Sequence, residues 1–93
     1  MNFKIRHADA FWTHFGELPF LVQEAVLDML ESMRDHPGDF IDRDLVLPVT
    51  AACTRAARVD VASQYIWFMI LFQYDADELT LHALDVVAIN EEK

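Results

Sequence analysis

Residues 65–74 read YIWFMILFQY, an uncharged run with one amide side chain, and no other part of the sequence constrains the fold as strongly. A transmembrane helix needs about 20 apolar residues. This run has half that length, with Ser63-Gln64 before it and Asp75-Ala76-Asp77-Glu78 after it, which excludes a membrane span. A strand with neighbours on both edges and cover on both faces can be apolar throughout. We therefore expect the run to form the central strand of a sheet.

The segments on either side of this run carry strand patterns of their own. Before it, alternate positions from Cys53 to Val61 are mostly apolar, and after it the segment from Leu79 to Val87 is again apolar. Short polar turns between three such segments are typical of an antiparallel meander. Within the central strand, alternation places Tyr65, Trp67, Met69 and Leu71 on one face and Ile66, Phe68, Ile70 and Phe72 on the other.

The first forty residues predict a short strand and two amphipathic helices. Residues 1–6 alternate, with Phe3 and Ile5 on one side. Two stripes at helical spacing follow, formed by Ala8, Phe11, Trp12, Phe15 and Leu18, and then by Leu21, Val22, Ala25, Val26, Met29, Leu30 and Met33. Pro19 suits the first turn of the second helix, and His36-Pro37-Gly38 ends it. We expect Phe20 and Leu27, beside the second stripe, to widen its core face; the alternative is an apolar strip for a partner.

Length and charge limit the classes of function. Ninety-three residues form a single domain, 1–93, of the α+β class. The chain has sixteen acidic and seven basic residues, for a net charge of −9. Because phosphate groups repel such a chain at long range, we do not expect direct binding to nucleic acid. The alternative is that the acidity only maintains solubility. One cysteine, Cys53, and no recognisable signal peptide suggest the reducing cytoplasm.

The order of these elements resembles the RelE/ParE superfamily, the toxins of prokaryotic toxin–antitoxin pairs. The features that match are the Leu18-Pro19 joint, the amphipathic helix ending at His36-Pro37, and the segment RVDVASQYIWFMILFQYDADELTLHAL at 58–84. The resemblance implies an N-terminal strand, a two-helix hairpin and a three-stranded antiparallel meander, all in one small sheet.

The resemblance also implies a choice between two activities. RelE-type members cleave mRNA on the ribosome with basic residues, often with a Tyr or His near the C-terminus, whereas ParE-type members bind DNA gyrase. Arg58 and Tyr65 match the family pattern, but Ile66 stands where an Arg usually follows, and the chain ends in Asn90-Glu91-Glu92-Lys93. The remaining catalytic candidates are Arg55, Arg58, Tyr65 and His82, with Lys4 and Arg6 as RNA contacts. The alternative is that Arg58 pairs with an acid on a neighbouring strand and His82 is an ordinary sheet residue.

We therefore expect a protein that acts by binding another protein, such as an antitoxin or gyrase, rather than by cutting RNA. Two alternatives stay open: a ribosome-dependent endoribonuclease with an unusual site, and an acidic inhibitor or immunity-type protein that binds a basic partner. The residues that we expect at the partner surface are Phe20, Leu27, Phe40, Leu45, Leu47, Ile66 and Phe68. Residues 40–47 form either this surface or an internal lid, and homodimer formation stays open.

No motif for a metal or a cofactor is recognisable, and we expect neither. His7, His14 and Glu17 lack a supporting zinc motif, and the acids at 75–78 lack the spacing of a calcium loop. Cys53 has no neighbours that would make it a nucleophile, so we expect a small buried apolar residue there.

Overall fold

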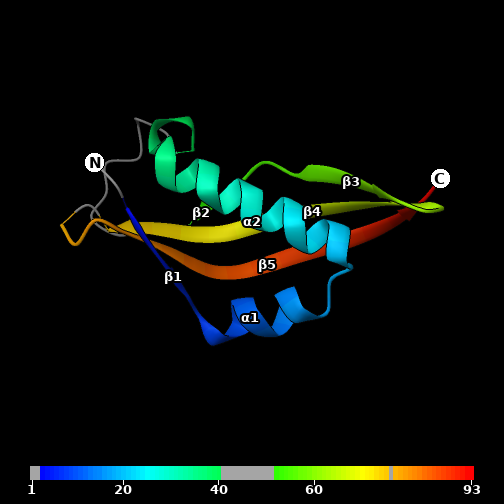
Figure 1. Ribbon diagram of the computed structural model, residues 1–93, viewed down its shortest axis with the longest axis horizontal. Helices are drawn as coiled ribbons and strands as arrows, with labels where there is room; N and C mark the ends of the chain where they lie inside the picture. Colours follow the sequence, from blue (N-terminus) through cyan, green and yellow to red (C-terminus); the bar gives the residue numbers. More distant parts are fainter. Residues whose placement is uncertain (1–2, 41–51, 76) are drawn as a thin grey trace.

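The computed structural model describes residues 3–40, 52–75 and 77–93. The elements in chain order are β1 (Lys4–His7), α1 (Asp9–Gly16), α2 (Phe20–Asp35), the 3₁₀ turn η1 (Pro37–Asp39), β2 (Ala52–Cys53), β3 (Ala57–Val61), β4 (Gln64–Asp75) and β5 (Thr80–Glu92) (Figure 1). The predicted α+β class, with two helices and a sheet, is confirmed. The expectations for Leu45 and Leu47 concern positions outside the described residues.

The strands form one mixed sheet in which β4 is central. The order is β1-β5-β4-β2, and β3 also pairs with β4. The strand β4 is antiparallel to β2, β3 and β5, whereas β1 is parallel to β5. The apolar run at 65–74 is therefore the central strand, as its composition predicts.

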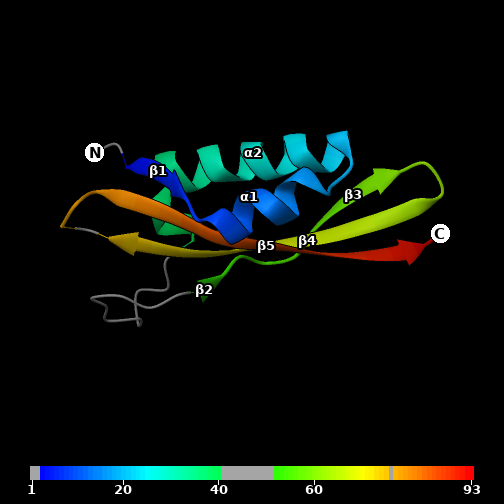
Figure 2. The same cartoon turned by 90° about the horizontal axis from the view of Figure 1, so that it is seen from below.

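Both helices lie on the same side of the sheet (Figure 2). The core on that side combines Phe11 of α1 and four residues of α2 with alternate residues of β4 and β5: Val22, Val26, Leu30, Met33, Ile66, Phe68, Ile70, Phe72, Tyr74, Leu81, Ala83 and Val86. Ile66 and Phe68 are only 2% and 1% exposed, so their assignment to a partner surface is wrong. Alternation separates the two faces of β4 correctly, but because both are apolar it does not tell which one the helices cover.

Several apolar residues expected in the core are exposed. Phe20 and Leu27 are 70% and 42% exposed, so the expectation that they widen the core face is wrong. Trp12 and Leu21, which belong to the two apolar stripes, are about half exposed. The buried surfaces of both helices are thus narrower than their apolar stripes, which leaves large side chains on the outside of the molecule.

The strand predicted at 53–61 is interrupted. Cys53 pairs with Leu71 whereas Ala57 pairs with Phe68, so residues 54–56 contain one residue more than the matching part of β4. Such a bulge reverses which side chains face the core. Buried Thr54 accounts for the distortion, since its Oγ1 accepts the N–H of Ile70 at 3.0 Å. The prediction of a buried Cys53 is therefore wrong, because Cys53 is exposed.

Candidate functional site

The candidate catalytic residues lie in two separate places. At one end of the sheet, the guanidinium of Arg58 lies 4.6 Å from the ring centroid of Tyr65, and its Nε is 3.3 Å from Oδ1 of Asp60. Arg55 is exposed in the interruption between β2 and β3. Arg58 is thus held by an acid of its own strand and by an aromatic ring.

His82 lies towards the other end of the sheet. It is in register with Gln73 of β4 and with Arg6 of β1, whereas Arg58 is in register with Trp67. At roughly 3.3 Å per residue, Trp67 and Gln73 are about 20 Å apart along β4. The structure therefore does not bring His82 together with Arg58 and Tyr65.

Exposed apolar side chains gather instead along the second half of β5. Val87 and Ile89 are 48% and 62% exposed. They lie opposite half-buried Met69 and Trp67 of β4, on the face away from the helices. This face ends at Tyr65, whose ring centroid is 5.2 Å from Nζ of Lys93.

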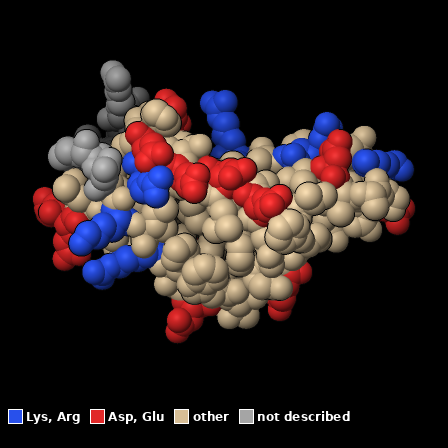
Figure 3. All heavy atoms as spheres, in the orientation of Figure 1, with Lys and Arg blue, Asp and Glu red and all other residues tan. Residues whose placement is uncertain are grey.

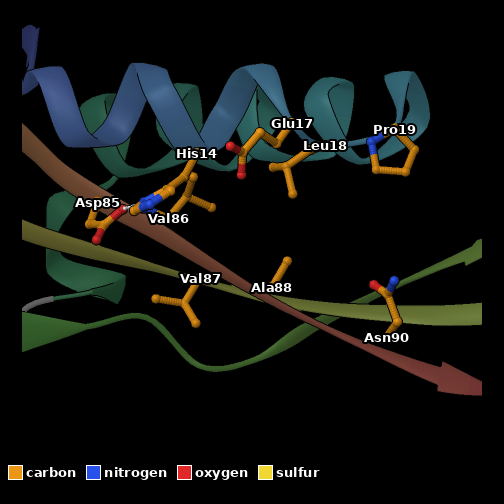
Figure 4. A pocket seen from close by; sticks show the side chains of 9 residues that line it. All are labelled: His14, Glu17, Leu18, Pro19, Asp85, Val86, Val87, Ala88 and Asn90. Atoms are coloured by element: carbon orange, nitrogen blue, oxygen red, sulfur yellow. Dashed lines mark hydrogen bonds and ion pairs between the residues drawn. The ribbon is translucent and has the colours of Figure 1, made fainter.

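A hollow of about 360 Å³ lies on the other side of β5, beneath the end of α1 (Figure 4). Its lining combines the helix joint with six residues of β5: His14, Glu17, Leu18, Pro19, Asp85, Val86, Val87, Ala88 and Asn90. Figure 4 shows Ala88 and Asn90 directed towards the joint and Val87 directed away from it. Phe20 and Leu21, both more than half exposed, follow Pro19 directly. We call this hollow and the four exposed residues Phe20, Leu21, Val87 and Ile89 the β5 groove.

An ion pair closes one end of the β5 groove. His14 Nδ1 lies 2.6 Å from Oδ1 of Asp85, and the same oxygen accepts the N–H of Val86 at 2.8 Å. The hydrogen bond to Asp85 and the charge of that carboxylate raise the pKa of His14. The pair therefore fastens α1 to β5 most firmly when His14 is protonated.

Of the six large apolar side chains that are exposed in the described residues, four belong to the β5 groove. The sequence reasoning identified Phe20 but missed Val87 and Ile89. A usable signal was present: the N-terminal strand pattern covers six residues, too few to pair with the whole of a long final strand. Phe40, another expected partner residue, is half-buried beside a second hollow of about 330 Å³ between α2 and β3.

Comparison with protein-family models, curated proteins and solved structures gives no match. Membership of the RelE/ParE superfamily therefore stays a prediction from the sequence pattern. In the described part of the chain, neither helix has the length and apolar composition that a membrane crossing requires. Residues 3–40, 52–75 and 77–93 also contain no cluster of three His, Cys, Asp or Glu side chains that is suited to a metal ion.

Proposed function

We propose that this chain is a RelE/ParE-like domain that acts by binding another protein and not by cutting RNA. The observation that carries the proposal is the position of the exposed apolar residues: Val87 and Ile89 lie on the second half of β5, and Phe20 and Leu21 directly follow Pro19, which lines the hollow beside that strand. Exposed apolar patches bordered by polar residues commonly mark protein–protein contacts. The order of strands and helices agrees with the resemblance seen in the sequence.

The distribution of polar groups gives RNA cleavage less support. Attack by a 2′-hydroxyl requires a base, an acid and a positive group around one phosphate. Arg58 and Tyr65 lie about 20 Å along β4 from His82, and Arg58 is already paired with Asp60. With a net charge of −9, the chain also repels RNA at long range.

Induced expression tests the choice between the two activities. Growth and mRNA 5′ ends are followed in cells that express the wild-type chain, Arg58→Ala or His82→Ala. We expect no new ribosome-dependent cuts with any of the three. Cuts that appear with the wild type and disappear with Arg58→Ala would overturn the proposal.

Affinity capture tests the binding surface. A tagged wild-type chain is compared with a Val87→Lys/Ile89→Lys double variant, and Leu27→Lys serves as a control outside the β5 groove. Lysine at 87 and 89 places two charges where apolar contacts are proposed, so a specific partner should be captured by the wild type and the control only. Equal capture by all three chains would exclude the β5 groove as the binding surface.

A second candidate function is supported by a row of acids along α2 (Figure 3). Glu24, Asp28 and Glu31 are all exposed, at a helical spacing that places them on one side. Such a row fits an inhibitor that occupies the nucleic-acid surface of a basic protein. Capture that falls steeply with salt and is lost in Glu24→Lys/Glu31→Lys, but not in Val87→Lys/Ile89→Lys, would favour this function.

A further inference from the structure

The second half of β5 has an unpaired edge. The strand β1 pairs with residues from Thr80 to Ala83 only. The chain then turns into α1, and the N–H of Ala8 donates to the carbonyl of Ala83 at 2.9 Å. From Leu84 to Glu92, no strand of the described residues lies on that side of β5. Within the described part of the chain, these nine residues of β5 therefore have one edge without a backbone partner, and α1 contacts the start of this edge through His14 and Asp85.

The hydrogen bonds of Ile70 show which backbone groups line this edge. Its N–H donates to Thr54 Oγ1 and its carbonyl accepts from the N–H of Thr54, so both groups point away from β5. Ile70 is the antiparallel partner of Val86. In an antiparallel pair, the backbone N–H and C=O groups of the two residues either bond to each other or point away from each other, towards the outer sides of the two strands. The backbone groups of Val86 therefore face the free edge.

Alternation along the strand extends this result. Since Val86 points outwards, so do the N–H and C=O groups of Ala88, Asn90 and Glu92. The N–H of Lys93 bonds to Ser63, on the side of β4, which fits the same alternation. Asp85 already occupies the N–H of Val86. Three outward N–H groups, at Ala88, Asn90 and Glu92, thus remain for another strand.

Acidic and apolar side chains follow one another in a regular order beside this edge. Val87, Ile89 and Glu91 lie on the face away from the helices, and the carboxylate of Asp85 before them turns at the edge to His14 of α1, so the order along β5 is acid, apolar, apolar and acid. On the other face the hollow is lined by Leu18, Pro19 and Ala88, with Glu17 at the joint. A strand placed here would meet apolar surface in its centre and negative charge towards both ends.

We propose that an extended segment of a partner protein adds to the free edge of β5 as a new strand, with Lys or Arg opposite Asp85 and Glu91 and apolar residues opposite Val87 and Ile89. The proposal rests on the proposed protein-binding function and names the kind of segment bound. Backbone bonds to Ala88 and Asn90 supply affinity, and cross-strand side-chain pairs supply specificity. Exposed Phe20 and Leu21 provide further apolar contact beside the joint.

Charge favours this occupant over a second copy of the chain. The edge carries Glu17, Asp85, Glu91 and Glu92, against Lys93 and the ion-paired His14. Two copies of the chain, each with a net charge of −9, would bring these acids together across the new strand pair. A basic segment neutralises them.

The test uses the full chain and the blocked peptide Thr-Lys-Thr-Val-Thr-Val-Thr-Lys-Thr. The peptide reads the same in both directions, so the orientation of the added strand need not be assumed. A matched peptide has Glu in place of both Lys. Amide hydrogen exchange is followed by NMR at each residue of β5, with and without saturating peptide.

Strand addition predicts an alternating result. The amides of Ala88, Asn90 and Glu92 should become slow to exchange with the Lys peptide, whereas those of Val87, Ile89 and Glu91, which already face β4, should not change. Ala88→Pro removes one outward N–H and should weaken binding about tenfold. Leu27→Ala, outside the β5 groove, should bind as the wild type does.

Three outcomes would overturn the inference: no added protection at Ala88, Asn90 and Glu92, equal binding of the Glu peptide, or protection without peptide that rises with protein concentration. The last would show that a second copy occupies the edge. The exchange pattern is measured on the wild type, so it stands even if Ala88→Pro does not fold. Capture of a partner through another surface would leave protein binding intact, and R58A-sensitive mRNA cuts would overturn the proposed function itself.

Discussion

Tyr74 allows a sharp test of how α2 ends. In a helix, the carbonyl of residue 33 accepts a hydrogen bond from the N–H of residue 37, but residue 37 is Pro and has no N–H. The carbonyl of Met33 is instead bonded by the hydroxyl of Tyr74, from the central strand, at 2.7 Å. Tyr74 is only 5% exposed, so water cannot readily replace this hydroxyl.

Tyr74→Phe should therefore lower the free energy of unfolding by about 1–3 kcal/mol, the cost of a buried acceptor without a donor. The ring and its contacts with Phe3 and Phe72 remain, so no cavity contributes to this cost. Tyr65→Phe is the matched control. Tyr65 is half-buried on the other face of β4, and its change should stay within about 0.5 kcal/mol.

Urea titrations followed by circular dichroism measure both changes, and pH provides a second check. Burial raises the pKa of Tyr74. The stabilisation linked to this shift is fully present below about pH 10, the pKa of an exposed tyrosine. It is lost as the pH rises towards the raised value. The wild type should therefore lose stability faster than Tyr74→Phe above pH 10. A cost of less than about 0.5 kcal/mol together with parallel alkaline profiles would contradict the bond to Met33.

Three further predictions concern the bulge, the ion pair and the core. In urea titrations, Thr54→Val should cost about 1–3 kcal/mol, since it leaves the amide of Ile70 without an acceptor; exposed Thr13→Val is the control. Asp85→Asn should lower the pKa of His14 towards its ordinary 6.5 in an NMR titration, and an unchanged value would exclude the ion pair. In the wild type, the stabilisation from this pair is fully present below pH 6.5 and is lost as pH rises through the raised pKa. Phe68→Ala should lower the free energy of unfolding by about 3–5 kcal/mol, and Ile89→Ala should lower it by less than about 0.5 kcal/mol. The reverse order would mean that the helices cover the face of the sheet that carries Ile89.

The secondary structure of this chain is readable because it depends on local patterns. The position of β4, the division of its side chains into two sets and both helices follow from periodicity and from Pro19 and Pro37. The face of the sheet that the helices cover does not follow from these local patterns. Tyr65, Trp67, Met69 and Leu71 are as apolar as the set that the helices bury, so only the tertiary packing decides which face is covered.

The candidate site was harder to predict because it depends on pairing between distant segments. One additional residue near Thr54 reverses the side-chain pattern of a strand, and the sequence Thr-Arg-Ala-Ala carries no bulge signal as clear as a glycine. The β5 groove exists because β1 is shorter than β5. Strand lengths are the least certain part of a prediction from sequence, and the mismatch between two of them defines the exposed edge.

An edge strand with exposed Val87 and Ile89 favours pairing between identical copies unless something opposes it. The described edge from Leu84 to Glu92 carries neither Pro nor Lys, which commonly give this protection. Its protection comes instead from Asp85, which occupies one outward N–H, and from acids whose charge repels a second copy. The same acids attract a basic strand. The acidity of this chain, which at first suggests only solubility, therefore has a structural consequence: it disfavours self-association at the free edge of β5, and it favours a basic sequence in the strand that we propose to bind there.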